Sequence, residues 1–215
     1  MSWDWLQRNA GLIASLLGQH AILALAPVLV ALVISLPLGF AVYRTGRGAK
    51  VILAVLGVIS SIPALALLVV VPLLLGTSIL SRVNVAVALT VYSVALLIRS
   101  VVEGLRSVPD RVRQSARAAG LGRSRRLLRI ELPLAMPVIF AGLRRVTVSN
   151  IALVTVAALV ASGGLGTLLQ LGYTSRFYTP LIAGLVLTVL LALVADAALR
   201  LIQRGTLPWT RARRA

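Results

Sequence analysis

Long uncharged runs alternate with short basic segments along the chain. Residues 21–43, 51–81 and 83–98 contain no charged side chain, and two further uncharged runs cover residues 146–161 and 177–195. A helix needs roughly 20 mostly apolar residues to cross the hydrocarbon core of a bilayer. The pattern therefore predicts helices that cross a membrane.

These runs predict an all-α, polytopic membrane protein with one transmembrane domain over residues 1–215. With helical extensions beyond the uncharged runs, five transmembrane spans are expected, at residues 21–43, 51–71, 83–101, 137–161 and 177–199. Residues 102–133 form one sizeable water-exposed loop between the third and fourth spans. Before the first span, residues 3–17 are expected to form a short amphipathic helix at the membrane surface, and His20 is expected to be an interfacial residue.

The composition agrees with the membrane interpretation. Hydrophobic residues make up 59% of the chain, charged residues make up 13%, and the mean hydropathy is +0.99. Soluble domains average about 25% charged residues, and disordered chains are low in hydrophobicity. The composition therefore excludes both an ordinary soluble enzyme and a disordered chain.

The charge distribution predicts the topology. The formal net charge is +17, from 22 basic and 5 acidic residues. If the first connection, the long loop and the C-terminal tail share one side of the membrane, that side holds 19 basic residues. The other side then holds only Arg8, Arg82 and Arg176. Because cytoplasmic loops attract Lys and Arg, the N-terminus is expected outside and the C-terminus inside. This topology accounts for the charge without a nucleic-acid partner, so none is expected.

Few residues offer catalytic or metal-binding chemistry. The chain has no cysteine and a single histidine, and Lys50 lacks the glycine spacing of a phosphate-binding loop. We therefore expect no catalytic residues, no metal site and no cofactor. Asp196 is the only acidic residue within a predicted span, and it lies four positions before Arg200. That spacing favours a local ion pair and argues against an ion-driven carrier.

The long loop has a helix–glycine–helix order. Pro109 and Asp110 can begin a helix over residues 111–119, and Gly120 and Gly122 can end it. A solvated positive loop would explain the surrounding arginines, but it would not explain this order. We therefore favour a docking function for the segment.

The second half of the loop is expected to lead directly into the fourth span. Ser124 can cap a helix over residues 125–131, and Pro133 is expected to start the turn into the span. On the first helix of the loop, the small side chains of Ser115 and Ala116 would let another protein approach closely.

The spacing of this segment resembles that of one transporter family. ABC-importer permeases carry a cytoplasmic pattern EAA-x3-G-x9-I-x-LP between two spans. The matching residues in this chain are Gln114, Ser115, Ala116, Gly120, Ile130, Leu132 and Pro133. The chain departs from the pattern at Gln114, where Glu is usual, and at Ser115, where Ala is usual. Gln114 keeps the length and hydrogen bonding of Glu but lacks its charge.

The resemblance extends over the chain and is closest to osmoprotectant importers of the glycine betaine, choline and carnitine type. Five blocks carry it in order: LVISLPLGFAVYRTG (32–46), SSIPALALLVVVPLLLG (60–76), ELPLAMPVIFAGLR (131–144), SGGLGTLLQLGY (162–173) and TLPW (206–209). The resemblance implies a multi-pass subunit of the bacterial cytoplasmic membrane that forms the pathway for a quaternary ammonium solute. The pathway subunits would be two copies of this chain or this chain and a paralogue.

The resemblance also implies partners and site residues. Cytoplasmic ATPase subunits would hydrolyse ATP, and an extracytoplasmic binding protein would deliver the solute. The residues that would couple the permease to the ATPase are Gln114, Ser115, Ala116, Gly120, Leu121, Gly122, Ile130, Leu132 and Pro133.

Polar and small residues within or beside the spans are candidates for the pathway or its gate. We hypothesise that these are Ser60, Ser61, Pro63, Ser162, Gly163, Gly164 and Gly166. Serine in a membrane helix often bonds back to its own backbone instead, which is the alternative at these positions. Only Tyr92 and Phe140 lie in the spans away from the interfaces, too few for an aromatic cage around a quaternary ammonium group. Selectivity is therefore expected in the binding protein.

Three other functions remain open. A permease of the same architecture could carry an amino acid or another small solute. A non-transporting membrane anchor could use the arginine-rich loop to recruit a protein or anionic lipid. A nucleic-acid binder would show steep dependence of its affinity on salt.

Overall fold

The computed structural model describes residues 2–46, 48–78, 81–158 and 163–210. Within these ranges helices are the only regular secondary structure, which confirms the all-α prediction. The elements are α1 (Trp3–Arg8), α2 (Ala10–Arg44), α3 (Gly48–Ser61), α4 (Ala64–Leu75), α5 (Arg82–Arg106), α6 (Asp110–Ala118), α7 (Arg123–Arg126), a π-helix (Leu127–Glu131), α8 (Leu132–Ala157), α9 (Gly166–Thr174), α10 (Tyr178–Thr206) and a 3₁₀ turn (Pro208–Thr210).

Four helices are long and apolar enough to cross a membrane. They are α2, α5, the continuous helix Arg123–Ala157, and α10. The pair α3 and α4 also passes as one span when taken together, although the chain bends by 101° between them. The described part of the chain therefore holds four candidate spans, or five if the bent pair is counted as one span.

The N-terminal segment differs from the prediction. Only Trp3–Arg8 forms the separate short helix, because Asn9 interrupts it with a non-helical backbone and bonds through Nδ2 to Trp5 O at 2.8 Å. Residues 10–17 continue without a break into α2. The predicted surface helix over residues 3–17 is therefore wrong beyond Arg8.

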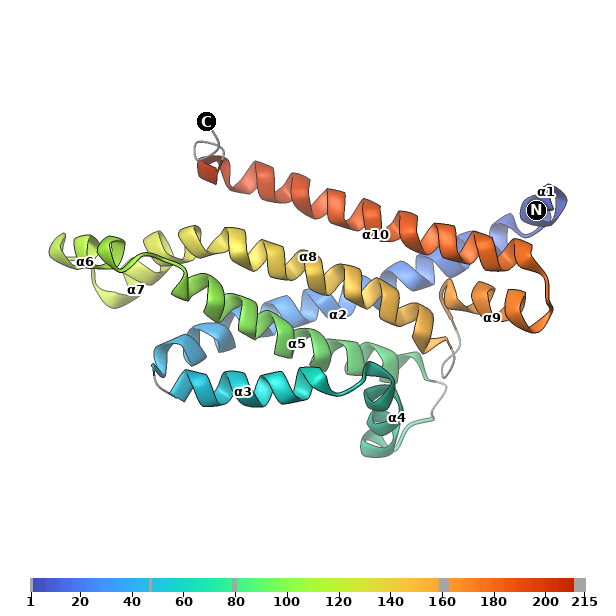
Figure 1. Cartoon of the computed structure of the whole chain (residues 1–215), viewed down its shortest axis with the longest axis horizontal. Helices are drawn as coiled ribbons and strands as arrows, with labels where there is room; N and C mark the ends of the chain where they lie inside the picture. The colour runs from blue at the N-terminus through green and yellow to red at the C-terminus, as the bar shows by residue number, and fades with distance from the viewer. Residues whose placement is uncertain (1, 47, 79–80, 159–162, 211–215) are drawn as a thin grey trace.

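The span predicted at residues 51–71 is not one straight helix. Pro63 stands at the N-cap of α4 with φ −54° and ψ 130°. Proline has no backbone N–H and disfavours a helical conformation in the residue before it. These two effects end α3 at Ser61 and redirect the chain into α4 (Figure 1).

The loop between the third and fourth spans is shorter at both ends in the structure than the predicted range, residues 102–133. α5 runs to Arg106, and at the other end α7, the π-helix and α8 form one helix. Pro133 therefore does not begin a turn, and Gly122 stands at the N-cap in place of Ser124. The Leu132 N–H reaches back five residues to Leu127 O, a wider turn that brings Pro133 into the first turn of α8, where its missing N–H is tolerated.

α5 lies at the centre of the bundle and packs against α2 and α8. A Cβ atom on Gly39 would lie 2.6 Å from Val101 Cγ1, and one on Gly142 would lie 2.2 Å from Ser100 Oγ. Small residues thus let these helix backbones approach closely, as is common in membrane helices. α10 lies at the edge of the bundle and leaves most of its apolar surface exposed.

The two ends of the elongated molecule carry different elements. α6 and α7 project at one end, while α1 and α9 lie at the other (Figure 1). α9 is a short helix that the sequence pattern did not predict. It packs against α10, and a Cβ atom on Gly172 would lie 2.6 Å from Leu181 Cβ.

Candidate functional site

The docking segment predicted from the sequence forms a shallow depression. Arg111, Val112, Ser115 and Ala116 of α6 line one side of it, and Ile130 of the π-helix lines the other. Its volume is about 400 Å³. The fold thus brings together residues of the motif that are 14 positions apart in the sequence, Ala116 and Ile130.

The remaining motif residues surround this depression. Gln114 is exposed on α6, as is Ser115, whose hydroxyl donates to Arg111 O at 3.0 Å. Leu132 and Pro133 are half-buried at the start of α8. Leu132 packs against the cluster formed by Val101, Leu105 and their neighbours, so the motif is anchored on the core.

Glycine is required at the end of α6. Gly120 has φ +74°, a conformation that residues with a side chain rarely adopt. The Leu121 N–H donates to Ala116 O at 3.1 Å, and the Gly120 N–H donates to Arg117 O at 2.9 Å. This pair of bonds is a Schellman motif, which ends the helix and satisfies its last carbonyls.

Arg113 ties α6 to the rest of the bundle, a role that sequence reasoning missed. Its guanidinium pairs with Asp110 at 2.7 Å, donates to Leu105 O at 2.9 Å and lies 5.9 Å from the centre of the Tyr43 ring. α6 is therefore attached to the C-terminal ends of both α5 and α2.

Glu131 forms a second attachment beside the first. The residue is 2% exposed, and its carboxylate pairs with Arg126 Nε at 2.7 Å and accepts a hydrogen bond from Tyr43 Oη at 3.2 Å. Tyr43 thus contacts both Arg113 and Glu131. The sequence held a usable signal, because a buried carboxylate needs a partner and the nearest basic neighbours lie within one or two helical turns.

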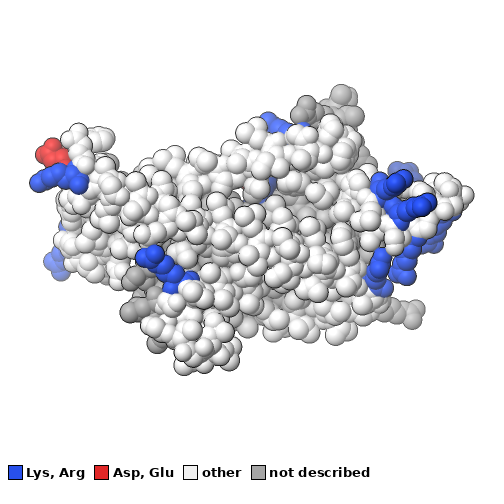
Figure 2. All heavy atoms as spheres, turned by 180° about the vertical axis from the view of Figure 1, so that it is seen from behind, with Lys and Arg blue, Asp and Glu red and all other residues white. Residues whose placement is uncertain are grey.

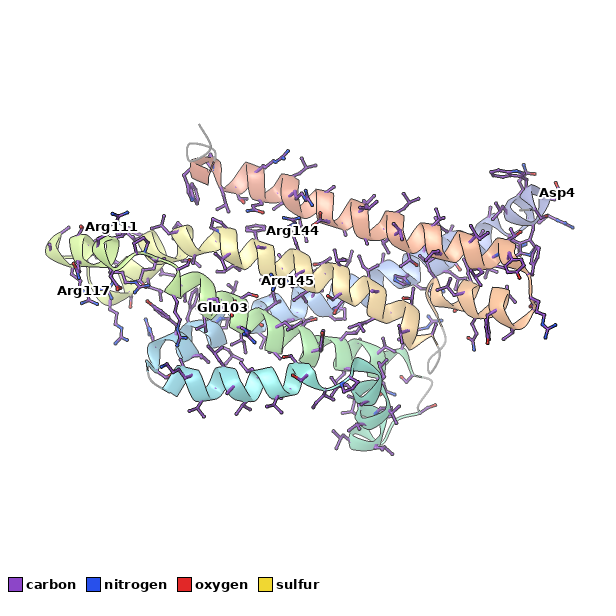
Figure 3. The ribbon with its side chains drawn as sticks, in the orientation of Figure 1. Asp4, Glu103, Arg111, Arg117, Arg144 and Arg145 are labelled. Atoms are coloured by element: carbon purple, nitrogen blue, oxygen red, sulfur yellow. The ribbon has the colours of Figure 1, made fainter. Side chains whose placement is uncertain are left out.

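Basic residues gather at this end of the molecule. Figure 2 shows Lys and Arg concentrated over the tip formed by α6 and α7, with few on the middle of that face. Arg111 and Arg117 project from α6 in Figure 3. A partner that docks in the depression would meet this positive surround.

The candidate gate residues fall into two separate places (Figure 1). Ser60 and Ser61 end α3, and each hydroxyl donates to Gly57 O at 2.9 Å. They therefore bond back to their own helix, which was the alternative considered. Pro63 marks the bend between α3 and α4. Ser162 lies outside the described residues.

The second place is the junction of α8 and α9, which holds Gly163, Gly164 and Gly166. Gly163 and Gly164 have φ values of +125° and +74°, so both positions favour glycine. A Cβ atom on Gly166 would lie 2.3 Å from Thr155 O, so the α9 backbone packs directly on α8.

His20 is buried within the protein at this second place, and its position at the membrane interface stays a prediction. Its side chain has no solvent exposure. Nδ1 accepts from the Leu165 N–H at 3.1 Å, so the proton is on Nε2, which donates to Ile151 O at 3.0 Å. His20 of α2 thereby holds α8 and the loop before α9, and a Cβ atom on Gly164 would lie 3.1 Å from its Nδ1.

Polar groups deeper in the bundle are satisfied by one another. Asn150 Nδ2 donates to Ser93 Oγ at 3.0 Å and to Ala24 O at 3.4 Å. The three residues come from α8, α5 and α2, and all three are buried. The group joins the three central helices.

An ion-paired cluster joins α8 and α10. Asp196 pairs with Arg200 at 2.7 Å, which confirms the local pair predicted from spacing. The same carboxylate pairs with Arg144 Nε at 2.6 Å, a contact 52 residues apart in sequence that local reasoning missed.

Comparison with known proteins identifies the family. Residues 31–207 match the model of the binding-protein-dependent transport system inner membrane component. The osmoprotectant import permease protein OsmW of Salmonella typhimurium is 36% identical over 198 residues, covering 91% of this chain and 92% of that protein. The glycine betaine/carnitine/choline transport system permease protein OpuCB of Bacillus subtilis is 31% identical over 206 residues, covering 95% of this chain and 93% of that protein. The chain belongs to this inner membrane transport family.

Solved structures share the fold of this permease. A chain of the MetNI methionine ABC transporter in an inward-facing conformation superposes with a TM-score of 0.80 at 23% identity, over 96% of this chain and 99% of that chain. An amino acid ABC transporter crystallised with histidines gives a TM-score of 0.77 at 18% identity, over 95% and 99% of the two chains. The predicted resemblance to ABC-importer permeases is confirmed, and the chain is a multi-pass inner membrane subunit of such an importer.

Proposed function

We propose that this permease forms part of the translocation pathway for a quaternary ammonium solute such as glycine betaine, choline or carnitine. Relatives named for these solutes or for osmoprotectants match more than nine tenths of the chain at 31% to 36% identity. The buried side chains of Asn150 and Ser93 at the centre of the bundle are neutral and bond to each other. A pathway lined by neutral, paired groups of this kind would suit the brief passage of a solute that a separate binding protein selects.

The depression on α6 is the proposed docking site for a cytoplasmic ABC ATPase. The observation that carries this proposal is the convergence of Ser115, Ala116 and Ile130 on one surface at the basic tip of the molecule. Small residues let a partner approach the helix closely, and the surrounding arginines favour an acidic rim on that partner. The exposed side chain of Gln114 would offer the partner a hydrogen bond in place of an ionic contact.

In this proposal, the contacts that hold α6 to the bundle let it transmit movement as a rigid element. Arg113 links α6 to Leu105 O of α5, and Glu131 links Arg126 to Tyr43 of α2. The helix Arg123–Ala157 then continues into the bundle without a flexible joint. A displacement of the docked ATPase would therefore reach the spans as a movement of whole helices. The angle between α6 and α7 would be set by Gly120, Leu121 and Gly122. The start of α8 would be held against the bundle by Leu132 and Pro133.

The assembly would contain two permease chains, which are two copies of this chain or this chain and a paralogue. Cytoplasmic ATPase subunits would hydrolyse ATP, so this chain would be a transport subunit without catalytic residues or cofactor. An extracytoplasmic binding protein would deliver the solute to the end that holds α1 and α9. In this arrangement the N-terminus lies outside, and α6 and the C-terminus lie inside.

The two groups of candidate gate residues would act by different means. The α3–α4 bend, with Ser60, Ser61 and Pro63, would flank the pathway. The loop that holds Gly163, Gly164 and Gly166, together with Ser162, would form part of the outer gate. The contact of His20 with Leu165 would fix the position of that loop relative to α2 and α8.

Uptake of labelled glycine betaine into proteoliposomes, with a cognate ATPase and binding protein, tests the proposal. Ser115→Trp places a large ring in the depression from an exposed position, and Ala118→Trp is the control on an exposed part of α6 outside the depression. Uptake and ATPase binding are expected to fall by about tenfold or more for Ser115→Trp, which is about 1.4 kcal/mol. If Ser115→Trp took up solute at the wild-type rate, the proposed docking site would be wrong. Uptake of an amino acid in place of glycine betaine, choline and carnitine would overturn the proposed solute class.

A further inference from the structure

A cavity of about 580 Å³ lies between α8 and α10, separate from the α6 depression. Arg144, Arg145, Asp196 and Arg200 contribute its charged groups, three guanidinium groups against one carboxylate. The cavity therefore carries an excess of positive charge.

Arg145 is the group whose charge is not compensated. Asp196 uses one carboxylate oxygen for Arg144, at 2.6 Å, and the other for Arg200, at 2.7 Å. In the part of the chain that the structure describes, no carboxylate lies within ion-pairing distance of Arg145. An unpaired guanidinium beside membrane-spanning helices is costly unless an anion or water meets it. In Figure 3, Arg144 and Arg145 are labelled on either side of the α8 ribbon.

The cavity continues into an apolar surface. Val189 and Leu193 line it and are 50% and 61% exposed, respectively, so its wall merges with the exposed face of α10. A basic site joined to an exposed apolar helix face matches a molecule with an anionic head and hydrocarbon chains. A small hydrophilic solute would gain nothing from that apolar face.

We propose that this cavity binds an anionic phospholipid, with the phosphate of the headgroup on Arg145 and Arg200. The acyl chains would lie along Val189 and Leu193 of α10. Basic pockets between membrane helices bind anionic headgroups in this way, and the surplus of guanidinium groups selects an anionic over a zwitterionic lipid. The Arg144–Asp196 pair shapes the site and does not depend on the lipid. The site is independent of which solute the permease carries.

The test measures lipid binding by the full chain in nanodiscs. The nanodiscs contain phosphatidylcholine with increasing fractions of spin-labelled phosphatidylglycerol, and the immobilised fraction of the label reports binding. Arg145→Gln and Arg200→Gln are each expected to weaken phosphatidylglycerol binding by about fivefold, from about 1 kcal/mol for each cation near a membrane surface. Both variants leave the Arg144–Asp196 pair in place. The control Arg44→Gln removes a guanidinium outside the cavity, at the end of α2, and is expected to leave binding unchanged.

A third variant tests the cavity itself. Leu193→Trp fills the apolar part of the cavity and retains all three arginines, so it is expected to displace the lipid as well. Binding that is equal for phosphatidylglycerol and phosphatidylcholine would overturn the proposal. It would also be overturned if Arg44→Gln weakened binding as much as Arg145→Gln did. Crosslinking of Leu193→Cys to its counterpart in a second copy would show that protein covers the cavity instead.

Discussion

His20 links three segments that are far apart in the sequence. Its two ring nitrogens bond to Ile151 O of α8 and to the Leu165 N–H of the loop before α9, while the residue itself belongs to α2. The apolar pattern around His20 gives no sign of these contacts, because both partners are backbone atoms more than 130 residues away. The positive φ values of Gly163 and Gly164 are part of the same arrangement, since they turn the Leu165 N–H toward the ring.

Gly164→Ala tests this arrangement. The new Cβ would lie 3.1 Å from His20 Nδ1 on a backbone with φ +74°, so the loop must shift or bear strain. Strain of this kind costs of order 1–3 kcal/mol. We expect lower thermal stability of the purified permease and impaired solute uptake, with assembly on the ATPase retained. Thermal unfolding in nanodiscs and uptake in proteoliposomes measure the two effects.

The matched control is Gly18→Ala. Gly18 is a helical position of α2 near His20, and a Cβ atom there would meet nothing within 4 Å. Alanine is favoured over glycine in a helix interior by up to about 1 kcal/mol, so this variant should be as stable as the wild type or more so. Unchanged stability and uptake in Gly164→Ala would mean that the loop is not held by His20.

At the scale of elements, turn chemistry was predictable and long-range contacts were not. Gly120 was expected to end α6, and it does so because a positive φ at a helix end is a local property of glycine. The continuous path from α7 into α8 was missed, because Pro133 predicts a break unless a wider turn precedes it, and nothing local reveals that turn. The bend at Pro63 was missed because the apolar run continues through it.

Glu131 occupies the unspecified position of the motif between Ile130 and Leu132, and its role follows only from the fold. Its hydrogen bond with Tyr43 spans 88 residues, and the pairing of Arg144 with Asp196 spans 52. Sequence periodicity assigns residues to the faces of a helix, but it does not specify which helices become neighbours. The hydrogen bond of Glu131 with Tyr43 and the ion pair of Arg144 with Asp196 were therefore beyond the reach of local sequence reasoning.

Removal of the Glu131 charge is expected to loosen the connection between α6 and the bundle. Glu131→Gln leaves Arg126 without its anion in a site where the two side chains are only 13% and 3% exposed. Breaking a buried pair by removing one partner costs about 3 kcal/mol. We expect a clear drop in unfolding temperature and a lower ratio of solute transported to ATP hydrolysed. Differential scanning fluorimetry and paired measurements of uptake and ATP hydrolysis test both outcomes.

Glu103→Gln removes the same charge from an exposed pair. Arg99 and Glu103 lie 2.9 Å apart on α5 with half of each side chain in contact with solvent. Exposed pairs contribute about 0.5 kcal/mol or less, so this variant should behave like the wild type. If the two glutamate variants lost equal stability, the special role of the Glu131 pair would be wrong.

At the scale of the whole molecule, the charge of +17 separates into two unequal ends. The tip with α6 and α7 is densely basic, while the end with α1 and α9 carries few charges (Figure 2). Because Lys and Arg are retained on the cytoplasmic side, this asymmetry favours the predicted orientation, in which the proposed docking depression lies on the side where ATP is available. The same charge that sets the topology therefore surrounds the proposed ATPase contact.

The orientation can be tested cleanly because the chain has no cysteine. Asp4 and Arg117 are both exposed and lie at opposite ends of the molecule (Figure 3). A membrane-impermeant maleimide added to spheroplasts should label Asp4→Cys and leave Arg117→Cys unlabelled, since the predicted topology places residue 117 in the cytoplasm. Permeabilised spheroplasts should label both variants, which controls for the reactivity of each thiol. The reverse pattern in sealed spheroplasts would invert the topology, and it would place the α6 depression on the side where no ATPase can reach it.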